Sequence, residues 1–415
     1  MYFINRFYGA ENYGNYAFYV STLKMLGVVA VFGIDTFSLR HISEMITKDQ
    51  WGSIRRLTRS SYAAIVVMSL VVGVVVTTSA VWMAPVLEVP PLFLVLLSLM
   101  VLPFALNNYH LQCFRSEKNI LLFAGINFFL IPLLSVGFIA LLGFTGWNGL
   151  ENFWIPIGVH TTVILLISGL GILLWQRSLR RHQHLREVFV ERPISGPIGT
   201  MWRYGFPFLL ASTSVYFASW VIQFGLKAWS GAVELAIYDV SFRIGLLTIL
   251  PLMAINAIAA PKFSGFYGQG NIAGLQRTAQ YATLVTILVS TSIAAFIYLF
   301  PELLLDVFGE VYSGAVPVLL VITIAHLTNA VSGPNGFILL MSDHQELYKN
   351  IVLGSSLVTA IASIFLVREY GALGAAITYT IFAVLNNGFQ IYYVYRRLGI
   401  YTFPIRAVKD LFRSR

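Results

Sequence analysis

The apolar residues of this chain come in continuous runs of about 20, and they do not follow a helical or strand spacing. At 1.5 Å per residue, such a run crosses about 30 Å of hydrocarbon as a helix. Barrel strands would alternate polar and apolar residues over about ten positions, and these runs do not alternate. We therefore predict an all-α polytopic membrane protein. Its eleven predicted transmembrane helices are 15–38, 61–84, 92–111, 121–144, 153–175, 204–229, 233–260, 280–300, 315–341, 347–367 and 372–395.

The composition excludes several other classes of protein. Hydrophobic residues make up 57% of the chain and charged residues 11%, against about 25% charged in soluble proteins. The 14% aromatic content argues against disorder, and Cys113, as the single cysteine, excludes an intrachain disulfide. A net charge of +9 does not indicate nucleic-acid binding here, because the basic residues are spread over many short loops.

The distribution of basic residues predicts the orientation of the spans. Of the 27 Lys and Arg, 22 fall on one side of the predicted helices, three on the other and two within the membrane. Basic residues near span ends stay in the cytoplasm, which predicts a cytoplasmic C-terminus. Eleven crossings then place the N-terminus outside without a signal peptide. We therefore expect one more helix before Met1, in a twelve-helix parent.

The longest loop divides the predicted helices into two groups. We predict an N-terminal bundle of five helices over 1–176 and a basic cytoplasmic linker over 177–203. A bundle of six helices follows over 204–395, and a basic cytoplasmic tail occupies 396–415.

The two groups resemble each other when the sequence is shifted by 222 residues. An even number of helices per half would give both halves the same orientation, as parallel repeats around an axis along the membrane normal. We expect a cavity between the two bundles. The shift aligns Tyr16 with Tyr238, Arg40 with Lys262, Gly52 with Gly274, Arg55 with Arg277 and Asn107 with Asn329.

Two basic residues fall inside predicted spans, where a charge is costly unless it pairs or faces water. Lys24 and Arg243 lie about nine and ten residues into their spans, near mid-depth. The repeat shift places them three residues apart, on nearly the same face of equivalent helices. We predict that both bind an anionic group, for which a diphosphate is suited. The alternatives are that Asp239 neutralises Arg243 within the helix and that Lys24 extends to the membrane surface.

Acidic residues lie close in sequence to basic residues at two places in the predicted helices. Asp35 and Arg40 lie near the cytoplasmic end of the first span, and Asp239 lies four residues before Arg243. We predict that these residues form ion pairs or a gate and do not contact the substrate.

A polar stripe runs along the sixth span. Its members recur at three to four residues, which places them on one helical face. Such a stripe lines a sugar-binding cavity or forms hydrogen bonds to neighbouring helices, and the sequence leaves both open. The same two interpretations apply to five further polar residues, Asn107, Asn108, Gln112, Asn329 and Asn335. The stripe consists of Ser212, Tyr216, Ser219 and Gln223.

Enzyme motifs are missing from the sequence, which contains no HExxH, Walker A, GxSxG or CxxC pattern. We predict a transporter and not an enzyme, with no cofactor and no metal site. His182 and His184 in the basic loop are expected to be solvated. Without a nucleotide-binding domain, transport would draw on a proton or sodium gradient, on the membrane potential, or on consumption of the substrate.

Several stretches carry a family resemblance. They are 6–17 (RFYGAENYGNYA), Gly33-Ile34-Asp35 followed by Arg40, 237–243 (IYDVSFR), and 332–342 (SGPNGFILLMS) followed by 371–379 (GALGAAITY). Through these stretches, the chain resembles the polysaccharide transporter and O-antigen flippase family of the multidrug/oligosaccharidyl-lipid/polysaccharide (MOP) superfamily. The stretch at 6–17 resembles the turn that follows the first helix in members of that family.

The resemblance implies two six-helix bundles of MATE-like fold, a V-shaped cavity and rocker-type alternating access. It implies that the protein moves an undecaprenyl-diphosphate-linked oligosaccharide across the bacterial cytoplasmic (inner) membrane for O-antigen, capsule or exopolysaccharide synthesis. The expected partners are this substrate, membrane lipids, and the polysaccharide polymerase and chain-length machinery. We expect a monomer that binds no nucleic acid.

Two other functions compete with this one. A cation-coupled multidrug exporter of the MATE type would carry acidic residues at mid-depth, whereas Asp35 and Asp239 each have a basic neighbour. A polytopic polysaccharide polymerase or ligase would place a large loop outside. The longest outside loop, 301–314, is short.

Overall fold

A computed structural model describes residues 1–146, 152–181 and 198–404, although part of the α8 side chains (Ile198–Trp229) lie outside this description. Within these residues the elements are helices and their connections, which confirms the all-α prediction. Contacts divide the chain into two compact units, one of residues Phe7–Tyr216 and one of Met1–Arg6 with Phe217–Arg415. We call them the N-terminal and the C-terminal unit.

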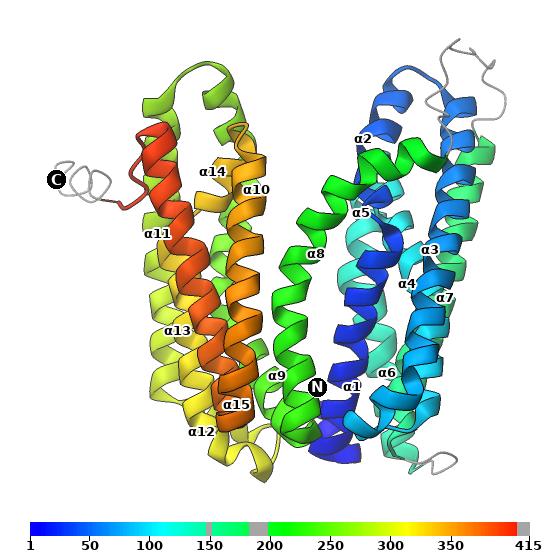
Figure 1. Cartoon of the computed structure of the whole chain (residues 1–415). Coiled ribbons are helices and arrows are strands. Elements are labelled where there is room, and N and C mark those ends of the chain that lie inside the picture. Colours follow the sequence, from blue (N-terminus) through cyan, green and yellow to red (C-terminus); the bar gives the residue numbers. More distant parts are fainter. Residues whose placement is uncertain (147–151, 182–197, 405–415) are drawn as a thin grey trace. The chain divides into compact units, whose positions relative to one another are not determined.

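The N-terminal unit is organised around one central helix. Helix α4 (Pro91–Ser116) contacts α2 (Ile34–Thr47), α3 (Trp51–Val86) and α7 (Trp154–Arg181), and Figure 1 shows α3, α4 and α7 running alongside one another. Helix α1 (Tyr2–Val31) packs on α4 through aromatic stacking of Phe18 on Phe93, with ring centroids 6.2 Å apart. The remaining elements are α5 (Ile120–Ala124), the π-helix η1 (Gly125–Leu130) and α6 (Ile131–Thr145).

Two backbone breaks interrupt the first helices of the chain. Gly9 has φ 86° and ψ 165° inside α1, within the stretch that resembles a turn. Phe32 and Gly33 both have positive φ, and α1 and α2 meet there at an angle of 55°. A positive φ is costly for a residue with a side chain, so Gly33 is suited to this bend.

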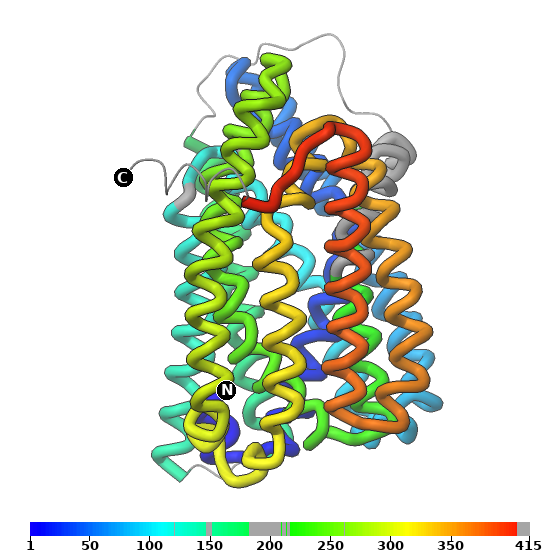
Figure 2. Tube along the Cα trace, turned by 90° about the vertical axis from the view of Figure 1, so that its left-hand side faces the viewer, coloured from blue at the N-terminus to red at the C-terminus, as the bar shows by residue number. Residues whose placement is uncertain are grey.

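The C-terminal unit is organised around α13 (Val316–Ser332). This helix contacts α9 (Gly231–Gly245), α11 (Ile272–Leu299) and α15 (Gln345–Leu398). The chain reverses direction within α15 at Gly371, and Figure 2 shows the orange and red parts of this element side by side. The other elements are η2 (Leu246–Ile249), α10 (Leu250–Gly268), α12 (Pro301–Asp306), η3 (Glu310–Ala315) and α14 (Asn335–Met341).

The number of membrane helices differs from the predicted eleven. Within the described residues, eight helices are long and apolar enough to cross a membrane, and the bent pair α1–α2 raises this to nine. Part of the difference arises because α15 is one element that covers two predicted spans, 347–367 and 372–395. The predicted span 204–229 falls in α8, where many side chains are not described.

The reversal in α15 depends on a close backbone approach at Gly374. A Cβ atom there would lie 1.8 Å from the carbonyl oxygen of Leu366, whereas a Cβ on Gly388, in the same element, would meet nothing within 4 Å. We expect Gly374→Ala to destabilise the protein by about 1–3 kcal/mol, because the backbone must move apart. Gly388→Ala should be neutral or slightly stabilising, since alanine favours helix. Thermal unfolding in detergent measures both, and equal melting temperatures would contradict the close approach.

Candidate functional site

The predicted substrate-binding Arg243 forms an ion pair within its own helix. Its Nε donates to Oδ2 of Asp239 at 2.7 Å, one turn earlier in α9. The side chain of Asp239 is 9% exposed and that of Arg243 is 39% exposed. The aspartate is therefore the more buried member of this pair, and the arginine is the more exposed one. This geometry matches the predicted ion pair and leaves the arginine accessible to an anion.

Aromatic side chains surround the helix that carries this ion pair. Phe242 lies 4.9 Å from the His326 ring and 5.0 Å from the Tyr379 ring, between centroids. Tyr238, which precedes Asp239, lies 5.9 Å from Phe242. His326 is 1% exposed, and neither of its ring nitrogens has a hydrogen-bond partner among the described residues. The ion pair is thus set beside a rigid, largely apolar cluster.

A chain of polar side chains leads away from this cluster along α13 and α15. Tyr379 is hydrogen-bonded to Asn329, which accepts a hydrogen bond from Nδ2 of Asn387. The same Nδ2 donates to the carbonyl oxygen of Ala383 at 2.7 Å. Asn329, which the sequence left ambiguous, therefore serves as a contact between two helices of the C-terminal unit.

Lys24, the second predicted cation, lies on α1 of the N-terminal unit. Its side chain is exposed, and it interacts electrostatically with His160 of α7. His160 is 7% exposed and packs against Tyr16 and Tyr19, at 5.7 and 6.3 Å between ring centroids. Tyr19 in turn is hydrogen-bonded to Thr161 at 3.0 Å. Lys24 thus lies beside a buried histidine and tyrosines, whereas in the C-terminal unit the buried His326 contacts Phe242, the residue before Arg243.

Both histidines were missed by the sequence reasoning, which weighed mainly Lys, Arg, Asp and Glu within the spans. His160 falls in the predicted span 153–175 and His326 in 315–341. A titratable side chain within a membrane span is itself a sign of function, and this criterion would have identified both residues.

The predicted pair of Asp35 and Arg40 is not formed in the described residues. Thr36 donates to the Asp35 carboxylate at 3.4 Å, and no salt bridge within 4.0 Å joins Asp35 to Arg40 in the part of the chain that the structure covers. Both residues lie on α2, where five positions turn the side chains by about 140° from each other. Neighbours on a helix are three or four residues apart. A role of either residue in a gate stays a prediction.

The polar stripe on α8 is only partly described. Gln223 donates to the Ser219 hydroxyl at 3.3 Å, as expected for residues one turn apart, and Tyr216 is 46% exposed. The side chain of Ser212 lies outside the described residues. Ser219 and Gln223 are therefore hydrogen-bonded to each other, and a contact of either residue with sugars stays a prediction.

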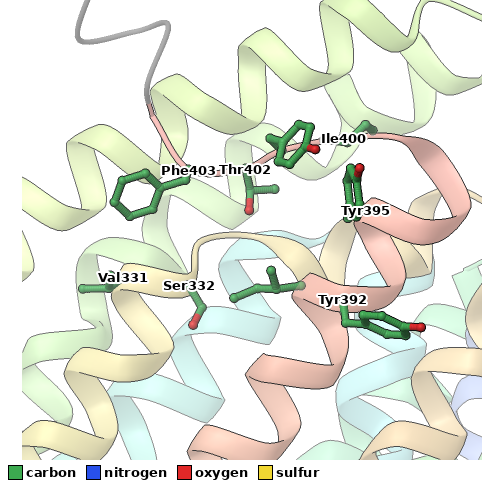
Figure 3. Close-up of a pocket in the computed structure, with 9 residues that line it drawn as sticks. Val331, Ser332, Tyr392, Tyr395, Ile400, Thr402 and Phe403 are labelled. Carbon is green, nitrogen blue, oxygen red and sulfur yellow. The ribbon is translucent and has the colours of Figure 1, made fainter.

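One pocket of about 390 Å³ lies at the end of the C-terminal unit where α13 and α15 both finish (Figure 3). Tyr392 and Tyr395 of α15 line it together with Tyr401 and Phe403 of the following segment. A hydrogen bond with Tyr395 raises the pKa of Tyr401, because it stabilises the protonated hydroxyl. The sequence reasoning did not single out this pocket.

The basic side chains among these residues can hold an anion. In the described part of the chain, no group of three His, Cys, Asp or Glu residues could hold a metal ion. Arginine and lysine, by contrast, are well suited to phosphate groups, the first by paired hydrogen bonds and the second as a point charge.

Solved structures with the same fold are transporters. An inward-facing multidrug resistance MATE family transporter of the MOP superfamily aligns with a TM-score of 0.73 at 16% identity, over 96% of this chain and 93% of that chain. A MOP superfamily transporter from Pyrococcus furiosus aligns with a TM-score of 0.56 at 16% identity, over 96% and 94%. Identities this low establish the fold alone. No curated protein sequence matches the chain significantly.

Two protein families match the sequence itself. Residues 207–340 match the MatE family. Residues 1–267, more than half of the chain, match the family described as polysaccharide biosynthesis protein. The protein is therefore a multi-pass membrane protein that belongs to the polysaccharide biosynthesis family of MOP-superfamily transporters.

Proposed function

We propose that this protein flips an undecaprenyl-diphosphate-linked oligosaccharide from the cytoplasmic to the outer leaflet of the bacterial inner membrane. The main supporting observation is the Asp239–Arg243 pair, in which the aspartate side chain is 9% exposed and the arginine side chain is 39% exposed. A diphosphate needs positive charge that is accessible within the membrane, and this arrangement provides it. The match to the polysaccharide biosynthesis family supports the same substrate class.

Lys24 supplies a second positive charge in this proposal. It is exposed on α1 beside His160 and the tyrosines, so its ammonium group is available to an anionic ligand as well as to its neighbours. Ser219, Gln223 and Tyr216 of α8 would contact the sugars, which hydroxyl and amide groups bind through hydrogen bonds. Ser212 would continue this stripe.

A cation-coupled multidrug exporter is the second candidate, because residues 207–340 match the MatE family and the structural relatives include MATE transporters. An exporter of cationic drugs requires an accessible carboxylate within the membrane. The carboxylate of Asp239 is 9% exposed and bound to Arg243, which favours the anionic substrate.

The proposal includes an energy source and partners. We propose coupling to a proton or sodium gradient or to the membrane potential, because the enzyme motifs for nucleotide hydrolysis are missing from the sequence. We further propose a cytoplasmic C-terminus, a monomeric protein, and a polysaccharide polymerase with its chain-length machinery as the recipients of the product.

Reconstitution distinguishes the two candidates. We expect purified protein in proteoliposomes to accelerate the transfer of an undecaprenyl-diphosphate-linked oligosaccharide between leaflets, measured by its accessibility to an added glycosidase. Ethidium uptake in the same vesicles, driven by a proton or sodium gradient, measures drug transport. Ethidium transport without oligosaccharide transfer would establish the exporter and overturn the flippase.

A further inference from the structure

Aromatic side chains cluster at one end of the C-terminal unit, and their surfaces are partly exposed. Tyr392, Tyr395, Tyr401 and Phe403 are 50, 47, 54 and 59% exposed, and all four line the 390 Å³ pocket. Figure 3 shows Tyr392 and Tyr395 on the end of α15 and Phe403 on the segment that follows it, and Val331 and Ser332 of α13 also line the pocket. Tyrosine at the end of a membrane helix is typical of the membrane–water interface.

The floor of this pocket is rigid. Gly399 ends α15 with φ 66°, which turns the chain back across the end of the unit. Ile400 is then 1% exposed within a core cluster that includes Phe263 and Leu275. Gln280 of α11 donates to the carbonyl oxygen of Tyr401 at 3.0 Å, which ties the segment to the helices below. Buried packing and a hydrogen bond therefore hold this segment in place.

A basic residue is bonded to one of the residues that line the pocket. Arg396 is exposed, its guanidinium carbon lies 5.9 Å from the centre of the Tyr392 ring, and its Nη1 donates to the Tyr392 hydroxyl at 3.1 Å. Arg397 follows directly and is also exposed. By sequence, the chain beyond Phe403 contains Arg406, Lys409, Arg413, Arg415 and one acidic residue, Asp410, all of which lie outside the residues that the structure describes.

We infer that this pocket is a binding site for an anionic phospholipid. The largely apolar lining is suited to a hydrocarbon chain. Arg396, which donates a hydrogen bond to the lining residue Tyr392, is suited to a phosphate. The lining contains no Lys or Arg, so the headgroup would meet Arg396 beside Tyr392. Basic residues at the cytoplasmic side of membrane helices are suited to anionic headgroups, and the positive residues of the sequence predict that this end is cytoplasmic. The site is separate from the Arg243 ion pair and does not depend on the proposed function.

Other occupants fit less well. The basic tail that follows Phe403 would bring like charges to Arg396, which is unfavourable. A free phosphate ion would leave the apolar walls uncovered. A polyprenyl-linked substrate shares the chemistry of a phosphate and a hydrocarbon chain, and the experiment below separates it from a phospholipid.

Native mass spectrometry of the full chain tests the site by titration with phosphatidylglycerol and, separately, phosphatidylcholine. We expect tighter binding of phosphatidylglycerol, and we expect Arg396→Gln to weaken it about fivefold, the effect of one basic residue near an anionic surface. Arg277→Gln is the matched control, because Arg277 is exposed and lies over Tyr281 at 5.8 Å, and Tyr281, unlike Tyr392, does not line the pocket. Equal weakening by both substitutions would overturn the site.

A second variant tests the pocket without changing the charge. Val331 lines the wall on α13, so Val331→Trp should fill the cavity and weaken phosphatidylglycerol binding to a similar extent. Binding unchanged in Val331→Trp would overturn the site, as would equal affinity for phosphatidylcholine and phosphatidylglycerol. If undecaprenyl phosphate displaces phosphatidylglycerol at equimolar concentration, the pocket belongs to the substrate and the phospholipid assignment is wrong.

Discussion

Arg243→Ala is expected to abolish surface polysaccharide. Charge-assisted hydrogen bonds to a phosphate contribute about 1.5–3 kcal/mol, so their loss should reduce transport about tenfold to hundredfold. The substitution also removes the ion pair of Asp239 with Arg243, and the Asp239 side chain is only 9% exposed. Breaking a buried ion pair costs about 3–5 kcal/mol, and less here because the arginine is partly exposed. Immunoblots for the membrane level of the protein must therefore accompany the measurement of polysaccharide.

The double variant Asp239→Asn/Arg243→Ala separates substrate binding from stability. It removes both charges of the pair, so position 239 carries no negative charge once Arg243 is replaced. We expect it to regain the melting temperature and membrane level of the unsubstituted protein while polysaccharide export stays lost. Recovery of export together with stability would show that Arg243 serves only to neutralise Asp239. Loss of export in Arg243→Ala but not in the double variant would therefore refute substrate binding by Arg243.

Lys24→Gln is expected to reduce transport about tenfold with little change in stability. The side chain is exposed on α1, and substitutions at such positions usually change the free energy of unfolding by less than about 0.5 kcal/mol. The loss would come from the missing positive charge near the substrate phosphate. Initial rates of oligosaccharide transfer in proteoliposomes, with melting temperatures alongside, measure the two effects.

Lys24→Arg is the control for charge. It keeps the positive charge beside His160 and changes only the shape of the cationic group. We expect it to retain more transport than Lys24→Gln. Equal losses in the two variants would indicate that Lys24 acts through packing and not through its charge.

Much of the fold could be predicted from the apolar runs, because a membrane span needs a minimum length of helix and little else. The breaks within the spans were harder to predict. The π-helix at Gly125–Leu130 lies just before Pro132, and the 3-10 helix at Leu246–Ile249 lies just before Pro251. Proline removes a backbone donor and so disturbs the preceding turn, but the form of the disturbance depends on the neighbouring helices.

The candidate site was predictable where contacts are local in sequence. The Asp239–Arg243 pair follows from a spacing of four residues on one helix, and so does the bond between Ser219 and Gln223. Contacts between helices were not predictable in this way. The packing of His160 against Tyr16, and of His326 against Phe242, joins residues more than 80 positions apart, and no periodicity in the sequence encodes such a pairing.

Thiol labelling tests most directly whether water and substrate reach positions 24 and 243. Cys113 is the single cysteine and is buried, so Cys113→Ala provides a background without thiols. Cysteines would replace Lys24, or Arg243 together with Asp239→Asn. Val75→Cys serves as the lipid-facing control, because Val75 is 61% exposed on the apolar helix α3.

A charged, membrane-impermeant methanethiosulfonate reagent, applied to both sides of opened vesicles, measures the labelling rates. We expect positions 24 and 243 to react well above the Val75 control and to be protected by undecaprenyl-diphosphate-linked oligosaccharide. Labelling as slow as at position 75, or labelling that the substrate leaves unchanged, would contradict substrate binding by these two basic residues.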